Sequence, residues 1–336
     1  MISYLKICML LLLSSLLGHA LKAIQNPEGA IEVRIPTYDH NGRISWELEA
    51  EEVDVVGQSI YSAKNPKMFI LENQKPSTVA KTSSGIFNIG KGIAQGDDNL
   101  LVEGEGFQAI GRPWTFEENI AGSKSHLAFA EQGKIGFEEG VDAGFVQEGE
   151  SQESTKVPSG GAGSDIMTDV SMTAEFSQEF PTTAYGEEIH IYDLGGGKKR
   201  FLMQKNVFIR MEDTESNSST PEYSTINCER AEILLGPDDN GTKVHAFGKI
   251  SQIHATGAVK LNQPSRRSSA DELKWSQGSG RVDLFGNAKV FHKKWGAAEG
   301  EKIVISQKDG RAEVIGGKQG RSRLLLPALN KSKFPK

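Results

Sequence analysis

Cysteine is nearly absent from this chain of 336 residues, which contains two. Cys8 lies in an apolar N-terminal run, so Cys228 is the single cysteine of the remaining sequence. A lone thiol forms no internal disulfide, which excludes a small fold held together by disulfide bridges. The chain must therefore obtain its stability from a core and from backbone hydrogen bonds, and its 37% of hydrophobic residues can supply that core.

Helical periodicity and motifs of catalysis are also lacking. Residues 50–56 are the only arguable helix, and their pattern suits a strand equally well. The seven histidines are scattered, without a metal-ligand spacing, and no Gly-x-Ser-x-Gly motif occurs. Residues 195–199, Gly-Gly-Gly-Lys-Lys, lack the spacing of a phosphate-binding loop and are interpreted as a hairpin turn. We therefore expect no enzymatic activity, no metal and no cofactor.

Nucleic-acid binding is not indicated either, because the basic residues are not interleaved with aromatic ones. The sequence from Pro264 to the end contains sixteen Lys and Arg residues and seven Asp and Glu residues, although the net charge of the whole chain is -6. Such a basic part attracts anionic lipid head groups or forms a solvated tail, and both interpretations stay open. Residues 327–336 are expected to be a basic tail.

Long apolar runs are confined to the N-terminus. Residues 7–17 are apolar, follow the single charge of Lys6, and precede Gly18-His19-Ala20. This pattern predicts a secretion signal over residues 1–20, and the run is shorter than the ~20 residues that span a bilayer. We expect the mature chain to work in the periplasm. An uncleaved anchor in the inner membrane is the alternative.

A repeated strand pattern is what the sequence does contain. Residues 282–290 (VDLFGNAKV) and 253–261 (IHATGAVKL) place apolar or small side chains at alternate positions around a glycine. Strict alternation is typical of strands with one buried face, and repeated copies bury that face by stacking. The sequence thus predicts an all-β, elongated antiparallel protein in which the central glycines permit a bulge or bend.

Turns and strand ends can be placed from the same pattern. Leu273 and Trp275 precede a turn at residues 277–280, so this strand should pair with residues 282–290. At the other end of the chain, Asn41-Gly42 predicts a tight hairpin, and Pro36 is expected to end the first strand. Residues 147–165, rich in Ser, Gly, Glu and Gln, are expected to be a flexible linker between similar halves, residues 25–146 and 166–326.

The repeats resemble the periplasmic bridge proteins of lipopolysaccharide transport, LptA and LptC, with their OstA-like domain. The resemblance rests on residues 231–233, 257–259, 270–275, 286–290 and 298–305. Residues 38–50 and 65–67 look more like the start of LptC, so the halves are expected to be an LptC-like domain and an OstA/LptA-like domain. The resemblance implies a V-shaped β-jelly roll whose open groove holds acyl chains and whose edges stack end to end.

Two sets of residues follow as candidates. The groove candidates are inward-facing apolar residues of the repeats, for which filling a closed core is the alternative: Ile253, Val259, Leu261, Leu273, Trp275, Val282, Leu284, Val290, Ile303 and Ile305. The candidates for assembly by strand addition lie on the first and last strands, unless the tails cover these edges: Ile31, Val33, Ile35, Ala312 and Val314.

The expected function is a periplasmic bridge that binds the acyl chains of lipopolysaccharide or a related glycolipid and moves them toward the outer membrane. Its expected protein partners are other β-jelly-roll transport proteins, joined through strand edges. The alternative is an exported structural or adhesive β-solenoid without lipid cargo. A polysaccharide-active enzyme is disfavoured, because clustered carboxylates with exposed aromatic residues are not found.

Overall fold

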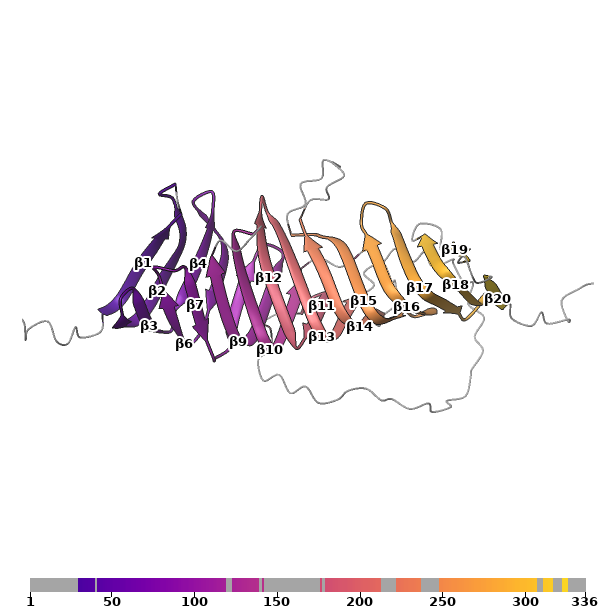
Figure 1. Ribbon diagram of the computed structural model, residues 1–336, viewed down its shortest axis with the longest axis horizontal. Helices are drawn as coiled ribbons and strands as arrows, with labels where there is room; N and C mark the ends of the chain where they lie inside the picture. Colours follow the sequence, from indigo (N-terminus) through magenta and orange to yellow (C-terminus); the bar gives the residue numbers. More distant parts are fainter. Residues whose placement is uncertain are drawn as a thin grey trace, which may run out of the picture.

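The computed structural model describes residues 30–39, 41–118, 123–138, 141, 176, 179–212, 222–236, 248–306, 311–316 and 322–325. Within these ranges the chain forms twenty strands and no helix, and the strands pair in antiparallel ladders (Figure 1). The prediction of an all-β, antiparallel fold is therefore confirmed. The predicted signal, linker and basic tail lie outside the described residues.

The strands are β1 (Ala30–Tyr38), β2 (Ile44–Gly57), β3 (Ile60–Lys64), β4 (Lys67–Glu72), β5 (Lys75–Lys81), β6 (Ser84–Asn88), β7 (Ile93–Gly96), β8 (Leu100–Gly104), β9 (Phe107–Glu118), β10 (Ser125–Phe137), β11 (Thr182–Gly186), β12 (Glu188–Gly195), β13 (Lys198–Glu212), β14 (Tyr223–Leu235), β15 (Ile250–Asn262), β16 (Arg266–Ser276), β17 (Arg281–His292), β18 (Gly296–Ser306), β19 (Ala312–Ile315) and β20 (Arg323–Leu325).

The long strands bend in the middle, and the two halves of each pair with different neighbours. In β13, residues 198–204 pair with β12 and residues 208–211 pair with β11. In β2, residues 46–49 pair with β4 and residues 52–57 pair with β3. Because each half buries apolar side chains on one face, the bends fold one strand network into two facing layers.

Layer A contains β4, β5, β8, β11 and β20 with one half of each long strand, and layer B contains β3, β6, β7, β12 and β19 with the other halves. We call the line of bends the seam. Opposite the seam, each hairpin turn joins strands of the same layer, as at residues 277–280 between β16 and β17. In the described residues, chain connections between facing layers therefore pass through the seam.

Left-handed backbone conformations produce several of the bends. Gly257 and Ala258 have φ angles of 83° and 47°, and Gly286 and Asn287 have φ angles of 70° and 47°. The ladder shifts register at both places, between β15 and β16 and between β17 and β18. Glycine adopts this conformation without the steric cost of a Cβ atom. The bulges predicted at the central glycines are thus confirmed.

The two predicted halves form one continuous structure. β10, the last strand of the first half, pairs with β11 through residues 133–137 and with β12 through residues 125–129. A single cluster of buried apolar side chains extends from Trp46 to Ile305. In Figure 1 the strands accordingly stack side by side along the whole molecule, from β1 at one end to β20 at the other.

Local predictions near the N-terminus had mixed outcomes. Gly42 donates to the carbonyl oxygen of Asp39 at 3.0 Å and has a φ angle of 75°, so the predicted hairpin is confirmed. Pro36 does not end its strand, because β1 continues to Tyr38. In the described residues β1 pairs with β2 alone, and such an edge strand tolerates a residue without an N–H. Residues 50–56 belong to β2 and are not helical.

Candidate functional site

The ten groove candidates all lie on the inner faces of the two layers. Seven face inward from layer B: Ile253, Leu273, Trp275, Val282, Leu284, Ile303 and Ile305. Val259, Leu261 and Val290 face inward from layer A. All ten belong to the continuous apolar cluster, and their relative exposure lies between 0% and 7%. The alternating apolar pattern in the sequence therefore identified side chains that share one interior.

This interior is packed. Between β4 and β5 of layer A and β12 and β13 of layer B lies a cavity of about 20 Å³, lined by Met68, Phe107, Leu127 and Ile191 among others. About one water molecule occupies such a volume. In the described residues the interior is thus closed, and the ten candidates fill it as side chains of a packed core do.

The side chains that fill the interior differ between the two ends. Large aromatic side chains occupy the half near the N-terminus, where Phe107 of layer A meets Phe201 of layer B with ring centroids 5.0 Å apart. The other half is mainly aliphatic. The sequence reasoning missed the aromatic part, although Trp114 and Phe116 alternate in β9 and were a signal for it.

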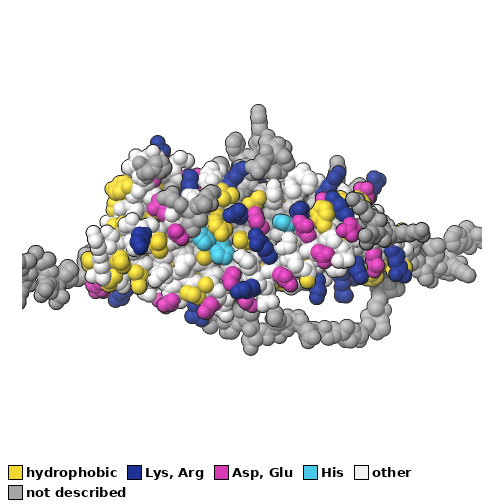
Figure 2. Space-filling model, in the orientation of Figure 1, with side chains coloured by type: hydrophobic (Ala, Val, Ile, Leu, Met, Phe, Trp, Pro, Cys, Tyr) yellow, Lys and Arg dark blue, Asp and Glu magenta, His cyan; other side chains and the backbone are white. Residues whose placement is uncertain are grey.

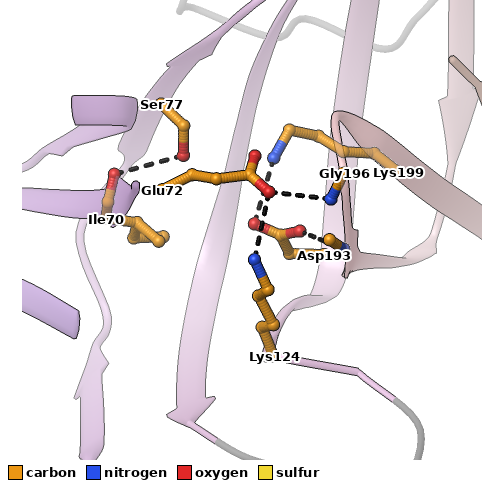
Figure 3. Close-up of polar contacts among 8 residues, drawn as sticks. Ile70, Glu72, Ser77, Lys124, Asp193, Gly196 and Lys199 are labelled. Atoms are coloured by element: carbon orange, nitrogen blue, oxygen red, sulfur yellow. Dashed lines mark hydrogen bonds and ion pairs between the residues drawn. The ribbon is translucent and has the colours of Figure 1, made fainter. Parts of the chain in front are cut away.

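A polar cluster adjoins the cavity at the edge of the layers opposite the seam. Figure 3 shows its contacts. Glu72, at the end of β4 in layer A, accepts hydrogen bonds from Lys124 Nζ at 3.0 Å and from the Gly196 amide at 2.7 Å. Asp193 and Lys199 of layer B form a buried ion pair at 3.4 Å and line the cavity. Charged groups thus connect layer A to layer B at the rim of an apolar cavity.

The pKa of Glu72 is lowered from its ordinary value. Burial of the carboxylate raises the pKa. The hydrogen bonds from Lys124 and Gly196 and the charges of Lys124 and Lys199 together lower it by more than burial raises it. The ionised form is therefore favoured in the folded protein. The sequence reasoning missed this cluster, because residues 72 and 196 are 124 positions apart.

The edge candidates occupy strands that each have one partner in the described residues. β1 pairs with β2, and the partly buried Val33 and Ile35 pack against the core. Ile31 belongs to β1 and pairs with Glu52 of β2, and its side chain lies outside the described part of the structure. Ala312 and Val314 belong to β19, which pairs with the layer B half of β18. Leu324 and Leu325 of β20, which pairs with the layer A half of β18, are exposed.

Two histidines form a second cluster on the outer face of layer B. His126 Nε2 and His190 Nδ1 lie 3.0 Å apart, and the rings are nearly parallel, at 14°. Tyr192 stacks on His126, and the guanidinium of Arg200 lies over the Tyr192 ring. Figure 2 shows histidine side chains gathered near the middle of the visible face, among charges of both signs. This cluster joins β10 to β12, which belong to the two predicted halves.

We expect the stability of the protein to fall as the pH is lowered from about 6.5 to about 4. Burial, with the charges of His190 and Arg200, lowers the pKa of His126 to about 4, whereas the unfolded chain takes up this proton near 6.5. Between these values the unfolded state binds more protons, so acid favours unfolding. Urea titrations at pH 7 and pH 5 measure the difference. The difference in the free energy of unfolding between the two pH values should be smaller in His126→Gln and unchanged in Tyr192→Phe. An unchanged difference in His126→Gln would show that His126 is not its cause.

Neither metal binding nor a membrane-spanning helix is evident in the described part of the chain. No group of three His, Cys, Asp or Glu side chains is arranged there to hold a metal ion. The same residues include no helix of the length and apolarity that a bilayer crossing requires. A comparison with protein-family models and one with curated proteins found no match. These comparisons do not identify the lipopolysaccharide transport family.

Proposed function

We propose that this protein is a periplasmic bridge component that binds the acyl chains of lipopolysaccharide, or of a related glycolipid, between its two layers. The observation that carries the proposal is the single apolar interior from Trp46 to Ile305, enclosed by layers that are hinged along one seam. Because the hairpins opposite the seam stay within one layer, the layers can separate there without breaking a strand ladder. The opened form would be the V-shaped jelly roll implied by the sequence resemblance.

The chemistry of the interior suits a sliding acyl chain. Contact with apolar side chains stabilises a lipid tail by about 25 cal/mol per Å² of surface removed from water, without requiring a fixed orientation. The buried Nε1 atoms of Trp114 and Trp275 and the hydroxyl of Thr78 have no hydrogen-bond partner among the described residues. An unpaired buried polar group costs about 1–3 kcal/mol. Ester or hydroxyl oxygens of a bound lipid would supply the missing partners.

Lipid extraction tests this proposal directly. Protein purified from the periplasm should release acyl lipid detectable by mass spectrometry, and protein without lipid should take it up from micelles. Trp275→Ala should weaken uptake, whereas Lys289→Ala, on the outer face of β17, should not. Thermal unfolding identifies any loss of uptake that is caused by unfolding. If no acyl lipid is recovered or taken up, the transport proposal is wrong.

Assembly through strand edges is part of the same proposal. β19 and β20 have one neighbour each among the described residues, and Leu324 is 64% exposed beside Leu325. Unpaired strand edges with apolar side chains favour strand addition. We expect Leu324→Lys with Leu325→Lys to weaken self-association about tenfold, the equivalent of about 1.4 kcal/mol. Sedimentation velocity measures this, with Tyr223→Lys as the control. Equal association of both variants would exclude this edge.

A structural role without lipid cargo is the second candidate. It is favoured by the tight packing of the interior, where the cavity is about 20 Å³. On this hypothesis the ten buried candidates contribute only to the stability of the fold, and the correctly folded protein takes up no lipid. The micelle experiment therefore separates the two functions.

A further inference from the structure

The turn between β12 and β13 presents a backbone amide, that of Gly196, at the mouth of the interior. Gly195, Gly196 and Gly197 have φ angles of 77°, 66° and 74°. Backbone amides in turns of this kind bind anions. The Gly195 amide donates to Asp193 Oδ1 at 2.8 Å, and the Gly196 amide is the one that faces Glu72. A Cβ atom on Gly195 would lie 2.7 Å from Lys124 Cε, so the Lys124 side chain lies across the turn. Gly196 in the same turn has open space on its Cβ side, because a Cβ atom added there would meet nothing within 4 Å.

A carboxylate from the other layer already occupies this site. Oε1 of Glu72 accepts both the Gly196 amide, at 2.7 Å, and Lys124 Nζ, at 3.0 Å, and the Glu72 side chain is 17% exposed (Figure 3). The positive charge of Lys199 also acts on Glu72. Lys124 is held in place by its own amide, which donates to the Asp193 carbonyl oxygen at 2.7 Å. The Gly196 amide and Lys124 Nζ therefore form an anion site beside the Lys199–Asp193 ion pair, and Glu72 is an internal occupant that comes from layer A.

The apolar cavity lies directly under this site. Asp193 and Lys199 line the cavity together with Met68, Ile70 and Leu127. The hydroxyl of Thr78 also lines it and has no hydrogen-bond partner among the described residues. An anion site at the rim of an apolar space matches an amphipathic molecule with an anionic head and acyl chains.

We propose that the Gly196 amide and Lys124, with the charge of Lys199 nearby, bind a phosphate monoester on the head group of the transported glycolipid, and that Glu72 occupies this site while the layers are closed. The inference rests on the proposed function. Phosphate oxygens accept the same charge-assisted hydrogen bonds from an amide and an ammonium group as the Glu72 carboxylate does. Separation of the layers withdraws Glu72 with β4, because its strand belongs to layer A and the turn belongs to layer B. Head-group binding and opening of the interior are thereby coupled.

Inorganic phosphate tests the anion site without any lipid. Glu72→Ala should bind phosphate about tenfold more tightly than the unchanged protein, because a competing carboxylate is removed. Amide chemical shifts should report binding at Gly196. Glu103→Ala is the matched control: it also removes one carboxylate of layer A from a lysine, Lys81, but away from the glycine turn. Adding Lys124→Ala to Glu72→Ala should remove the gain.

Several outcomes would overturn the anion site. Equal phosphate binding by Glu72→Ala and Glu103→Ala, or shifts that omit Gly196, would mean that the turn binds no phosphate. Thermal unfolding monitors folding of each variant. If Glu72→Ala does not fold, Glu72→Gln is measured in its place, since it removes the charge and keeps the size of the side chain.

Micelles separate the head group from free phosphate as the source of the ligand. A glycolipid that carries a phosphate should be taken up about tenfold better than its dephosphorylated counterpart, and Lys124→Ala should reduce that preference. Equal uptake of the two lipids would overturn the head-group assignment and leave the transport proposal standing. Uptake of neither lipid would overturn the transport proposal, and phosphate binding without lipid uptake would identify a site for free phosphate.

Discussion

Phe201→Ala is expected to lower the free energy of unfolding by about 3–5 kcal/mol, the usual cost of truncating a buried phenylalanine. Phe201 is fully buried in layer B, and its ring meets those of Phe107 and Phe137 of layer A edge to face, at centroid distances of 5.0 and 5.2 Å. Edge-to-face pairs contribute beyond the area that they bury. Urea unfolding followed by circular dichroism measures the loss.

The matched control is Phe291→Ala in β17. Phe291 is 52% exposed and is absent from the buried cluster, so its removal should change the free energy of unfolding by about 0.5 kcal/mol or less. If the two variants were equally stable, the aromatic contact would not hold the layers together. Phe201→Ala should also ease separation of the layers, so any lipid uptake measured at equal folded fraction should increase.

The sequence was sufficient for features set by neighbouring residues. Alternation in residues 282–290 and the turn at residues 277–280 predicted the β16–β17 hairpin, in which Trp275 pairs with Val282. The same alternation identified the buried face of all ten groove candidates. Period-two patterns are local, so they specify which side chains share a face.

The sequence alone did not predict how the buried faces of the strands pack against one another. Glycine marked the bends of β15 and β17, but β13 bends at Lys205 and Asn206, which have φ angles of 62° and 51° without being glycine. A closed core and an open trough need the same alternation, so Leu284 could not distinguish them. Contacts such as Glu72 with Gly196 join distant positions, and their pairing depends on the register of many intervening strands.

Gly111→Ala is expected to lower the free energy of unfolding by up to about 3 kcal/mol, because the added methyl has no space. Gly111 lies in β9 beside the seam and pairs with Gly133 of β10, which pairs in turn with Gly186 of β11. A Cβ on Gly111 would lie 2.4 Å from Phe129 Cγ and 2.7 Å from the carbonyl oxygen of Gln132. The backbone oxygen cannot withdraw without disturbing the β9–β10 ladder, so the strain falls on the seam itself.

The three paired glycines form a graded series that isolates this cause. The three nearest neighbours of a Cβ on Gly133 would all be side-chain atoms of Ile189, from 2.6 Å, whereas a backbone oxygen is among those of Gly111, so Gly133→Ala should cost less than Gly111→Ala. A Cβ on Gly186 would have its nearest neighbours at 3.4 Å, an ordinary contact. Gly186→Ala should therefore be neutral or stabilising by about 0.4–1 kcal/mol, because alanine restricts the unfolded chain. Urea midpoints of the three variants give the order. If Gly186→Ala were as harmful as Gly111→Ala, loss of glycine in the strands would explain the effect, and close packing across the seam would not.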